Sequence, residues 1–151
     1  MNEESSEKEI RDFYRRWSRS IFAFCCLFLG SAERGEAATR EAFLVYVRQA
    51  SVLSSGPLPA GLLRCALDAM RDRCVLADPR ADTAGTLQQA ILRLPCEQRA
   101  VFILRNVLRV DAASVAAMTG LRLDQVRQLW MQSMLAVREV LPRDFFKERT
   151  Q

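Results

Sequence analysis

The chain contains no histidine, only 6 glycines in 151 residues, and only two lysines, Lys8 and Lys147. Histidine is the commonest general base and metal ligand, so its absence removes the usual means of acid–base and zinc chemistry. No glycine-rich phosphate loop is present, and no cluster of carboxylates has the spacing of metal ligands. We therefore expect no enzymatic activity, no metal ion and no cofactor.

Long apolar runs are also missing. The segment 21–29 is much shorter than the ~20 apolar residues of a membrane span, and the acidic, polar N-terminus does not resemble a secretory signal. The 5 cysteines form an odd set without a CxxC pair, so we expect reduced thiols that pack as small hydrophobes, with no disulfide. These features predict a cytoplasmic protein that does not enter a membrane.

The charge is unevenly distributed. Residues 1–85 contain twelve basic and twelve acidic side chains, whereas residues 86–151 contain ten basic and six acidic ones, so the net charge of +4 lies in the second half. A basic surface suits contact with phosphates. A solvated basic helix face explains the charge alone equally well.

Apolar residues recur at helical spacing through nearly the whole chain, and no segment alternates as a strand does. One stripe predicted to face a core comprises Ile10, Phe13, Tyr14, Trp17, Ile21, Phe24 and Phe28. Gly30 and Ser31 should end this helix, and further helices are expected at 33–50, 62–75, 86–94, 96–107, 111–118 and 123–141. The polar, proline-containing stretch 77–85 predicts a linker. The expected fold is all-α, with two small helical bundles joined by a linker.

A helix-turn-helix is predicted in the C-terminal bundle. Ala116 allows close helix approach, Gly120 makes the turn, and Val126 packs the second helix on the first. The outward positions of the second helix carry Arg127, Gln128, Met131 and Gln132. Arg suits guanine, Gln suits adenine, and Met suits the thymine methyl group, so this face is compatible with reading bases in the major groove. The alternative is an ordinary polar helix face.

Two parts of the chain match the pattern of a known family. A Leu-Pro step, an Arg and an apolar run ending in Leu-Arg occur in Leu94-Pro95-Cys96-Glu97-Gln98-Arg99-Ala100-Val101-Phe102-Ile103-Leu104-Arg105, and the register continues through Val115-Ala116, Gly120, Val126-Arg127 and Val137-Arg138-Glu139-Val140-Leu141. A weaker match comprises Phe13-Tyr14-Arg15-Arg16-Trp17, Phe28-Leu29-Gly30 and Glu41-Ala42-Phe43-Leu44. Together they resemble the bacterial RNA polymerase sigma factors of the extracytoplasmic-function type.

The resemblance implies three segments: a core-binding and promoter-melting domain at 1–76, a linker at 77–85, and a DNA-binding domain at 86–151. The implied partners are the RNA polymerase core, promoter DNA and an anti-sigma protein. The residues implied to contact DNA are Arg122, Arg127, Gln128, Met131 and Gln132. Those implied to contact the polymerase are Glu36, Arg40, Phe43 and Leu44.

The chain also departs from the family pattern. Leu129, Gln132 and Met134 replace arginines of the second helix, Arg122 replaces a Ser or Thr cap, and Ser114 replaces an acidic residue. In the N-terminal domain the departures are Ala37 and Arg40 for Asp and Gln, Gly61 for Trp, and Asp68 for Asn. Each lost phosphate contact removes counterion release, so DNA binding by this domain alone is expected to be weak.

Three functions fit these observations. The first is a divergent sigma factor that directs promoter recognition. The second is a sigma-like interaction protein that docks on polymerase or an anti-sigma partner without opening promoters, which the N-terminal departures favour. The third is a dimeric helix-turn-helix regulator, which would bind a palindrome, whereas a sigma factor reads two different elements.

Overall fold

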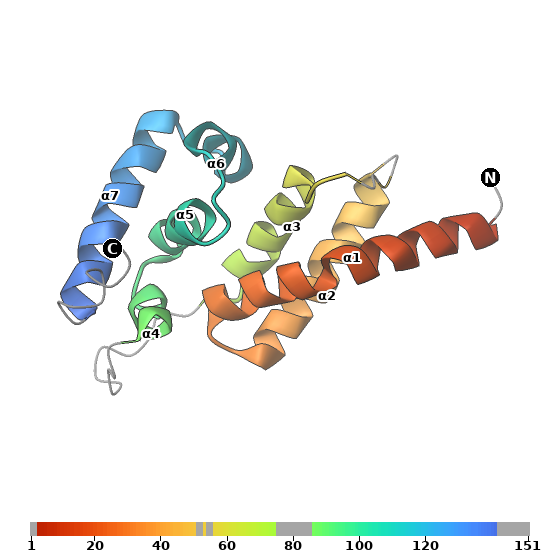
Figure 1. Ribbon diagram of the computed structural model, residues 1–151, viewed down its shortest axis with the longest axis horizontal. Coiled ribbons are helices and arrows are strands. Elements are labelled where there is room, and N and C mark those ends of the chain that lie inside the picture. Colours follow the sequence, from red (N-terminus) through yellow and green to blue (C-terminus); the bar gives the residue numbers. More distant parts are fainter. Residues whose placement is uncertain (1–2, 51–52, 54–55, 75–85, 142–151) are drawn as a thin grey trace, which may run out of the picture. The chain divides into compact units, whose positions relative to one another are not determined.

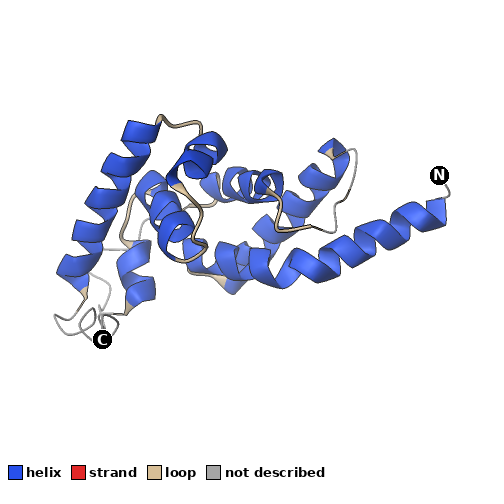
Figure 2. Ribbon diagram, turned by 45° about the horizontal axis from the view of Figure 1, so that its top comes forward, coloured by secondary structure: helices blue, strands red, loops and turns tan. Residues whose placement is uncertain are grey.

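The computed structural model describes residues 3–50, 53, 56–74 and 86–141 (Figure 1). These residues form seven α-helices and no strand, as the colouring by secondary structure makes plain (Figure 2). The chain divides into two compact units, Met1–Arg73 and Cys74–Gln151. The all-helical fold class predicted from the sequence is confirmed. The predicted linker at 77–85 lies outside the described residues.

The first unit is built on a hairpin of two helices, α1 (Glu3–Leu29) and α2 (Ala32–Gln49). Gly30 makes the turn with a φ of 70°, a conformation that costs glycine little because it has no Cβ. The Ser31 hydroxyl then caps α2 by accepting a hydrogen bond from the backbone N–H of Arg34 at 3.2 Å. The predicted helix end at 30–31 is confirmed, with the reason visible in these two residues.

The third helix of this unit, α3 (Ala60–Arg71), packs against both helices of the hairpin. The core comprises Phe13, Ile21, Phe24, Phe28, Ala38, Ala42, Phe43, Leu62, Leu63, Ala66, Leu67 and Met70. The helices approach closely at Gly35, where an added Cβ would lie only 2.7 Å from the Cys26 sulfur. Small residues on α2 thus allow the hairpin to close.

Part of the predicted core stripe on α1 is wrong. Ile10 and Tyr14 are 37% and 44% exposed, and Trp17 is half-buried. The spacing of apolar residues shows which face of α1 is hydrophobic but not how much of its length a neighbouring helix covers. Near its N-terminus this face borders an open groove.

The second unit contains α4 (Leu87–Leu92), α5 (Cys96–Asn106), α6 (Ala112–Thr119) and α7 (Leu123–Val140). α7 packs against the other three helices. Its buried residues are Val126, Ser133 and Val137, which confirms the inward position predicted for Val126, while Trp130 is half-buried. Thr86 caps α4 by accepting from the N–H of Gln89 at 3.2 Å.

The expectation of five free thiols is wrong. Cys74 and Cys96 form a disulfide, with a Cα–Cα distance of 6.5 Å, whereas Cys25, Cys26 and Cys65 are free. The two partners are separated by 22 positions and follow no recognised spacing motif. Pairing depends on the distance between Cβ atoms in the folded chain, and the sequence pattern does not reveal that distance.

Candidate DNA-reading and docking surfaces

The α6–turn–α7 segment is fixed locally by its own side chains. Asp111 caps α6, accepting hydrogen bonds from the backbone N–H of Ser114 at 3.1 Å and from its hydroxyl at 2.6 Å. These hydrogen bonds from Ser114 lower the pKa of the Asp111 carboxyl. Gly120 ends α6 in the left-handed conformation, with a φ of 77°. The two helices and the glycine turn therefore lie where the sequence predicted them.

The start of α7 compensates for its unusual cap. Arg122 occupies the N-cap position, but a guanidinium has only donors and cannot accept from the free N–H groups of the helix. Gln125 supplies one acceptor instead, because its side-chain oxygen accepts from the backbone N–H of Arg122 at 3.0 Å. Asp124 adds a negative charge to the first turn, where the helix dipole favours it.

The outward face of α7 brings together the predicted DNA-reading residues. Arg127, Gln128, Met131 and Gln132 are all exposed, and Met131 is 64% exposed. Gln132 lies at the edge of the row, where its side-chain oxygen accepts from Gln98 of α5 at 3.4 Å. Arg127, Gln128 and Met131 therefore project from the middle of the face, whereas the side chain of Gln132 is oriented toward α5.

The same face contains features that the sequence analysis missed. Leu123 and Leu135 are 39% and 56% exposed and extend the apolar part of the row on either side of Met131. The guanidinium of Arg122 lies 3.4 Å from the carboxylate of Asp124, so an adjacent negative charge offsets the charge of this predicted DNA contact. The helical spacing that identified the row could have identified both leucines, because they fall at i±4 from its members.

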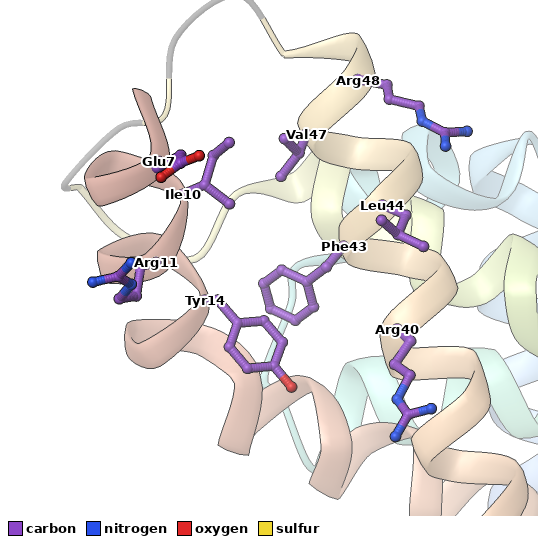
Figure 3. Close-up of a pocket in the computed structure, with 9 residues that line it drawn as sticks. All are labelled: Glu7, Ile10, Arg11, Tyr14, Arg40, Phe43, Leu44, Val47 and Arg48. Carbon is purple, nitrogen blue, oxygen red and sulfur yellow. The ribbon is translucent and has the colours of Figure 1, made fainter. Parts of the chain in front are cut away.

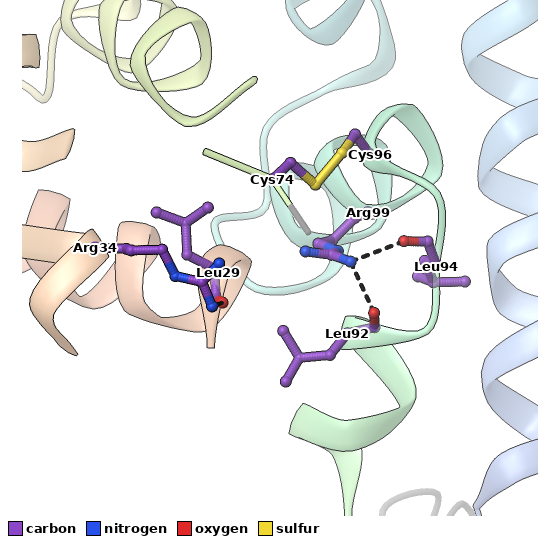
Figure 4. The surroundings of a disulfide bond; sticks show 7 residues. All are labelled: Leu29, Arg34, Cys74, Leu92, Leu94, Cys96 and Arg99. Carbon is purple, nitrogen blue, oxygen red and sulfur yellow. Dashed lines mark hydrogen bonds between the residues drawn. A yellow bond between two sulfur atoms is a disulfide. The ribbon is translucent and has the colours of Figure 1, made fainter. Parts of the chain in front are cut away.

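Arg99, the arginine of the Leu-Pro pattern, joins α4 to α5. Its side chain is fully buried, and its Nη2 donates to the carbonyl oxygens of Leu92 at 2.7 Å and Leu94 at 3.0 Å (Figure 4). Pro95 precedes α5, and its carbonyl accepts the N–H of Arg99 at 2.8 Å. The motif thus satisfies carbonyl groups where α4 ends, and its role here is structural.

A groove between α1 and α2 contains most of the predicted polymerase-contacting residues. Its volume is about 800 Å³, and its rim combines charged and apolar side chains (Figure 3). The lining residues are Glu7, Ile10, Arg11, Tyr14, Arg40, Phe43, Leu44, Val47 and Arg48. Of the predicted contacts, Leu44 is 59% exposed, whereas Phe43 is only 5% exposed and packs edge-on against Phe13 and Tyr14.

Two of the residues predicted to contact polymerase, Glu36 and Arg40, are paired with each other. The Arg40 guanidinium forms an ion pair with the carboxylate of Glu36, one turn earlier on the exposed face. Both were predicted to contact polymerase, so a polymerase side chain that binds either residue would have to compete with this ion pair. Ala37, which replaces an acidic residue of the family pattern, is exposed beside them.

A polar pocket of about 600 Å³ lies between α2 and α3, and Gly61 and Asp68 line it. The Asp68 carboxylate lies 3.5 Å from the guanidinium of Arg71. A carboxylate at this position would repel DNA phosphates, and the neighbouring arginine reduces that repulsion. Among the described residues, no group of three potential ligands is placed to hold a metal ion.

A scan against protein-family models and a search of curated proteins gave no significant match. Solved structures do match. The chain superposes on the co-crystal structure of the sigma factor RpoE in complex with the anti-sigma factor NepR from Bartonella quintana, with a TM-score of 0.65 and 16% identity, over 86% of this chain and 96% of that one. A chain of the RsbN–BldN complex gives a TM-score of 0.38 and 19% identity, over 92% of this chain and 98% of that one.

The first superposition covers both units, because its 86% share exceeds the length of either one. Among the described residues, no helix combines the length and the hydropathy that a bilayer crossing requires. The seven helices of the described residues form two units, and the α6–turn–α7 segment lies in the second. This architecture is consistent with the superposition. The chain has the fold of the sigma factor RpoE.

Proposed function

We propose that this protein is a divergent sigma factor of the extracytoplasmic-function type, which binds the RNA polymerase core through its first unit and directs promoter recognition through α7. The observation that carries the proposal is the exposed row of Arg127, Gln128 and Met131 on the second helix of a sigma-factor fold. Its chemistry covers guanine, adenine and thymine edges in the major groove. The protein acts by binding and positioning in the cytoplasm, and no covalent step is required.

The DNA-reading half of the proposal is tested by fluorescence anisotropy. DNA fragments are first selected from a genomic library with the full-length protein at low salt, and the best duplex is then titrated with variants. Arg127→Ala should weaken binding by ~1–3 kcal/mol, about 5- to 150-fold, if the guanidinium forms a bidentate contact with guanine. Arg15→Ala removes the same charge from an exposed position on α1 and serves as the matched control.

The two outcomes separate base reading from general charge. Equal losses for Arg127→Ala and Arg15→Ala would show that the row on α7 contributes only net charge. No change for Arg127→Ala combined with Gln128→Ala would refute base reading by α7 outright.

The docking half of the proposal is tested by binding to purified core polymerase. Leu44→Asp places a charge on the exposed apolar rim of the α1–α2 groove, and we expect it to weaken association at least tenfold, since a buried unpaired carboxylate is costly. Ala23→Asp introduces the same charge at an exposed position of α1 outside the groove-lining set and should leave affinity unchanged. Equal affinities for the two variants would contradict docking through this groove.

A second candidate function is a sigma-like interaction protein that docks on polymerase or on an anti-sigma partner without opening promoters. The specific observation that favours it is the pairing of charges at the departing positions, Arg40 with Glu36 and Asp68 with Arg71. The two functions differ in run-off transcription on the selected promoter fragment. The sigma-factor proposal predicts weak but measurable transcripts, increased by combining Ala37→Asp, Arg40→Gln and Asp68→Asn. Polymerase binding without any transcript, before and after these changes, would favour the interaction protein.

A further inference from the structure

The first turns of α1 extend beyond the two helices that pack against the rest of it (Figure 1). Residues 3–12 are all exposed, and the first buried residue of the helix is Phe13. Isolated helices shorter than ~12–15 residues are only marginally stable in water. This end of α1 is therefore a helical segment that a further packing surface would stabilise.

The exposed apolar side chains of the first unit gather where this segment borders α2. Ile10 and Tyr14 on α1 are 37% and 44% exposed, and Leu44 on α2 is 59% exposed. With Val47 they line the groove of about 800 Å³, in which the two helices face each other without meeting (Figure 3). An open apolar groove between two helices suits a third, amphipathic helix.

The charges around the groove indicate which helix fits. Residues 3–12 contain five acidic and two basic side chains, whereas the α2 wall of the groove carries Arg40 and Arg48. Among the described residues, no ion pair involves Glu7, Arg11 or Arg48. An acidic helix with an apolar face complements this wall, and the chain itself contains such a helix at the start of α1.

The groove-lining side of α1 is also complementary to itself. Glu7, Ile10, Arg11 and Tyr14 follow one another at spacings of three and four, so they share one side of the helix. When two copies of α1 lie antiparallel about a two-fold axis at Glu9, Glu7 of one protomer lies opposite Arg11 of its partner. The symmetry repeats this contact, so the two unlike charges form two reciprocal pairs.

We propose that a second copy of this chain occupies the groove: the N-terminal turns of α1 from each protomer pack between α1 and α2 of the other. The interface covers Ile10, Tyr14 and Leu44, which are otherwise exposed. Leu44 is a predicted polymerase contact, so the dimer closes the docking groove to polymerase; this consequence rests on the proposed function.

Sedimentation equilibrium of the full-length protein tests the dimer and its contacts. The unchanged protein should pass from monomer to dimer as its concentration rises. Glu7→Arg and Arg11→Glu each place like charges opposite each other twice, so each should weaken the dimer at least tenfold. Glu9→Arg is the matched control: it makes the same charge change on the opposite side of α1 and should leave the dissociation constant unchanged.

Mixing the two variants separates contacts between chains from effects within one chain. The Glu7→Arg chain carries two arginines at the contact and the Arg11→Glu chain two glutamates, so an equimolar mixture should dimerise where neither variant does alone. A single chain that carries both changes should dimerise like the unchanged protein. A monomer at every concentration, a mixture no tighter than its components, or equal losses for Glu7→Arg and Glu9→Arg would overturn the proposal.

Adding core polymerase to the dimer tests whether the groove is shared. Sedimentation velocity should show the dimer boundary replaced by a complex of polymerase with one protomer. A complex that contains both protomers would refute the closing of the groove. The dimer is measured without polymerase or DNA, so a chain that dimerises but fails to bind polymerase would contradict only the proposed function.

Discussion

Replacing Arg99 by methionine tests how the Leu-Pro pattern stabilises the second unit. Methionine retains most of the apolar volume of the arginine stem but has no donors. The fully buried guanidinium donates to the carbonyls of Leu92 and Leu94, so the variant leaves two acceptors without this partner where α4 ends. A buried unsatisfied acceptor costs ~1–3 kcal/mol. Leu94 is buried and Leu92 is half-buried, so water can replace part of the lost interaction at Leu92.

The expected loss is therefore about 2–4 kcal/mol in the free energy of unfolding. This is a large share of the ~5–15 kcal/mol that typically stabilises a domain. Urea denaturation followed by circular dichroism, at a fixed redox state of the disulfide, measures it. Arg127→Met is the matched control, since Arg127 is exposed and the same substitution there should stay within ~0.5 kcal/mol. Arg99→Lys should lie between the two, because one ammonium can reach one carbonyl.

Equal stabilities of Arg99→Met and Arg127→Met would refute the reasoning. The carbonyls of Leu92 and Leu94 would then be satisfied by water or by a small movement of α4. In that case the arginine of the motif would not be an anchor of the fold, and its place in the pattern would require a different explanation.

Three further predictions concern individual residues. Gly35→Ala should destabilise the first unit by ~1–3 kcal/mol, because its Cβ would lie 2.7 Å from the sulfur and 3.1 Å from the backbone nitrogen of Cys26; an unchanged melting temperature would contradict this. Hydrogen bonds from Ser114 lower the pKa of Asp111, so its stabilisation of α6 should persist at neutral pH and disappear as pH falls through that lowered value; Asp111→Asn should abolish this component of the acid transition. Burial raises the pKa of Cys25 to about 11, so the contribution of its thiol to the free energy of unfolding should be lost as pH rises from 9 to 11. Urea denaturation measures this loss: if the midpoint of Cys25→Ala fell with pH as steeply as that of the unchanged protein, the prediction would be wrong.

The helices could be predicted because their signals are local. Thr86 and Asp111 cap the helices that follow them, and Gly30 and Gly120 end the helices that precede them, each through contacts within a few residues. Helical spacing also placed Val126 inside and Met131 outside on α7. These features follow from backbone chemistry and from 3.6-residue periodicity, both of which the sequence contains in full.

The candidate sites could be predicted only in part, because they depend on contacts between distant segments. The exposure of Ile10 and Tyr14 depends on how far α1 and α2 diverge, which no local pattern specifies. Phe43 has the residue type of a docking contact, yet it is buried against Phe13. The disulfide joins positions 22 residues apart, and only the folded chain brings them together.

Short-range ion pairs link the departures from the family pattern on both surfaces. Arg40 pairs with Glu36 on α2, Asp68 with Arg71 on α3, and Arg122 with Asp124 at the start of α7. All three pairs are exposed, so each is worth only ~0–1 kcal/mol, and a strong partner could separate them. They reduce the long-range attraction to phosphates without blocking close contacts, because the fields of two opposite charges largely cancel at distances much greater than their separation, and salt screens the remainder beyond the Debye length of ~8–10 Å. A protein built in this way would bind weakly on its own to DNA, and its specificity would depend on being positioned by a partner.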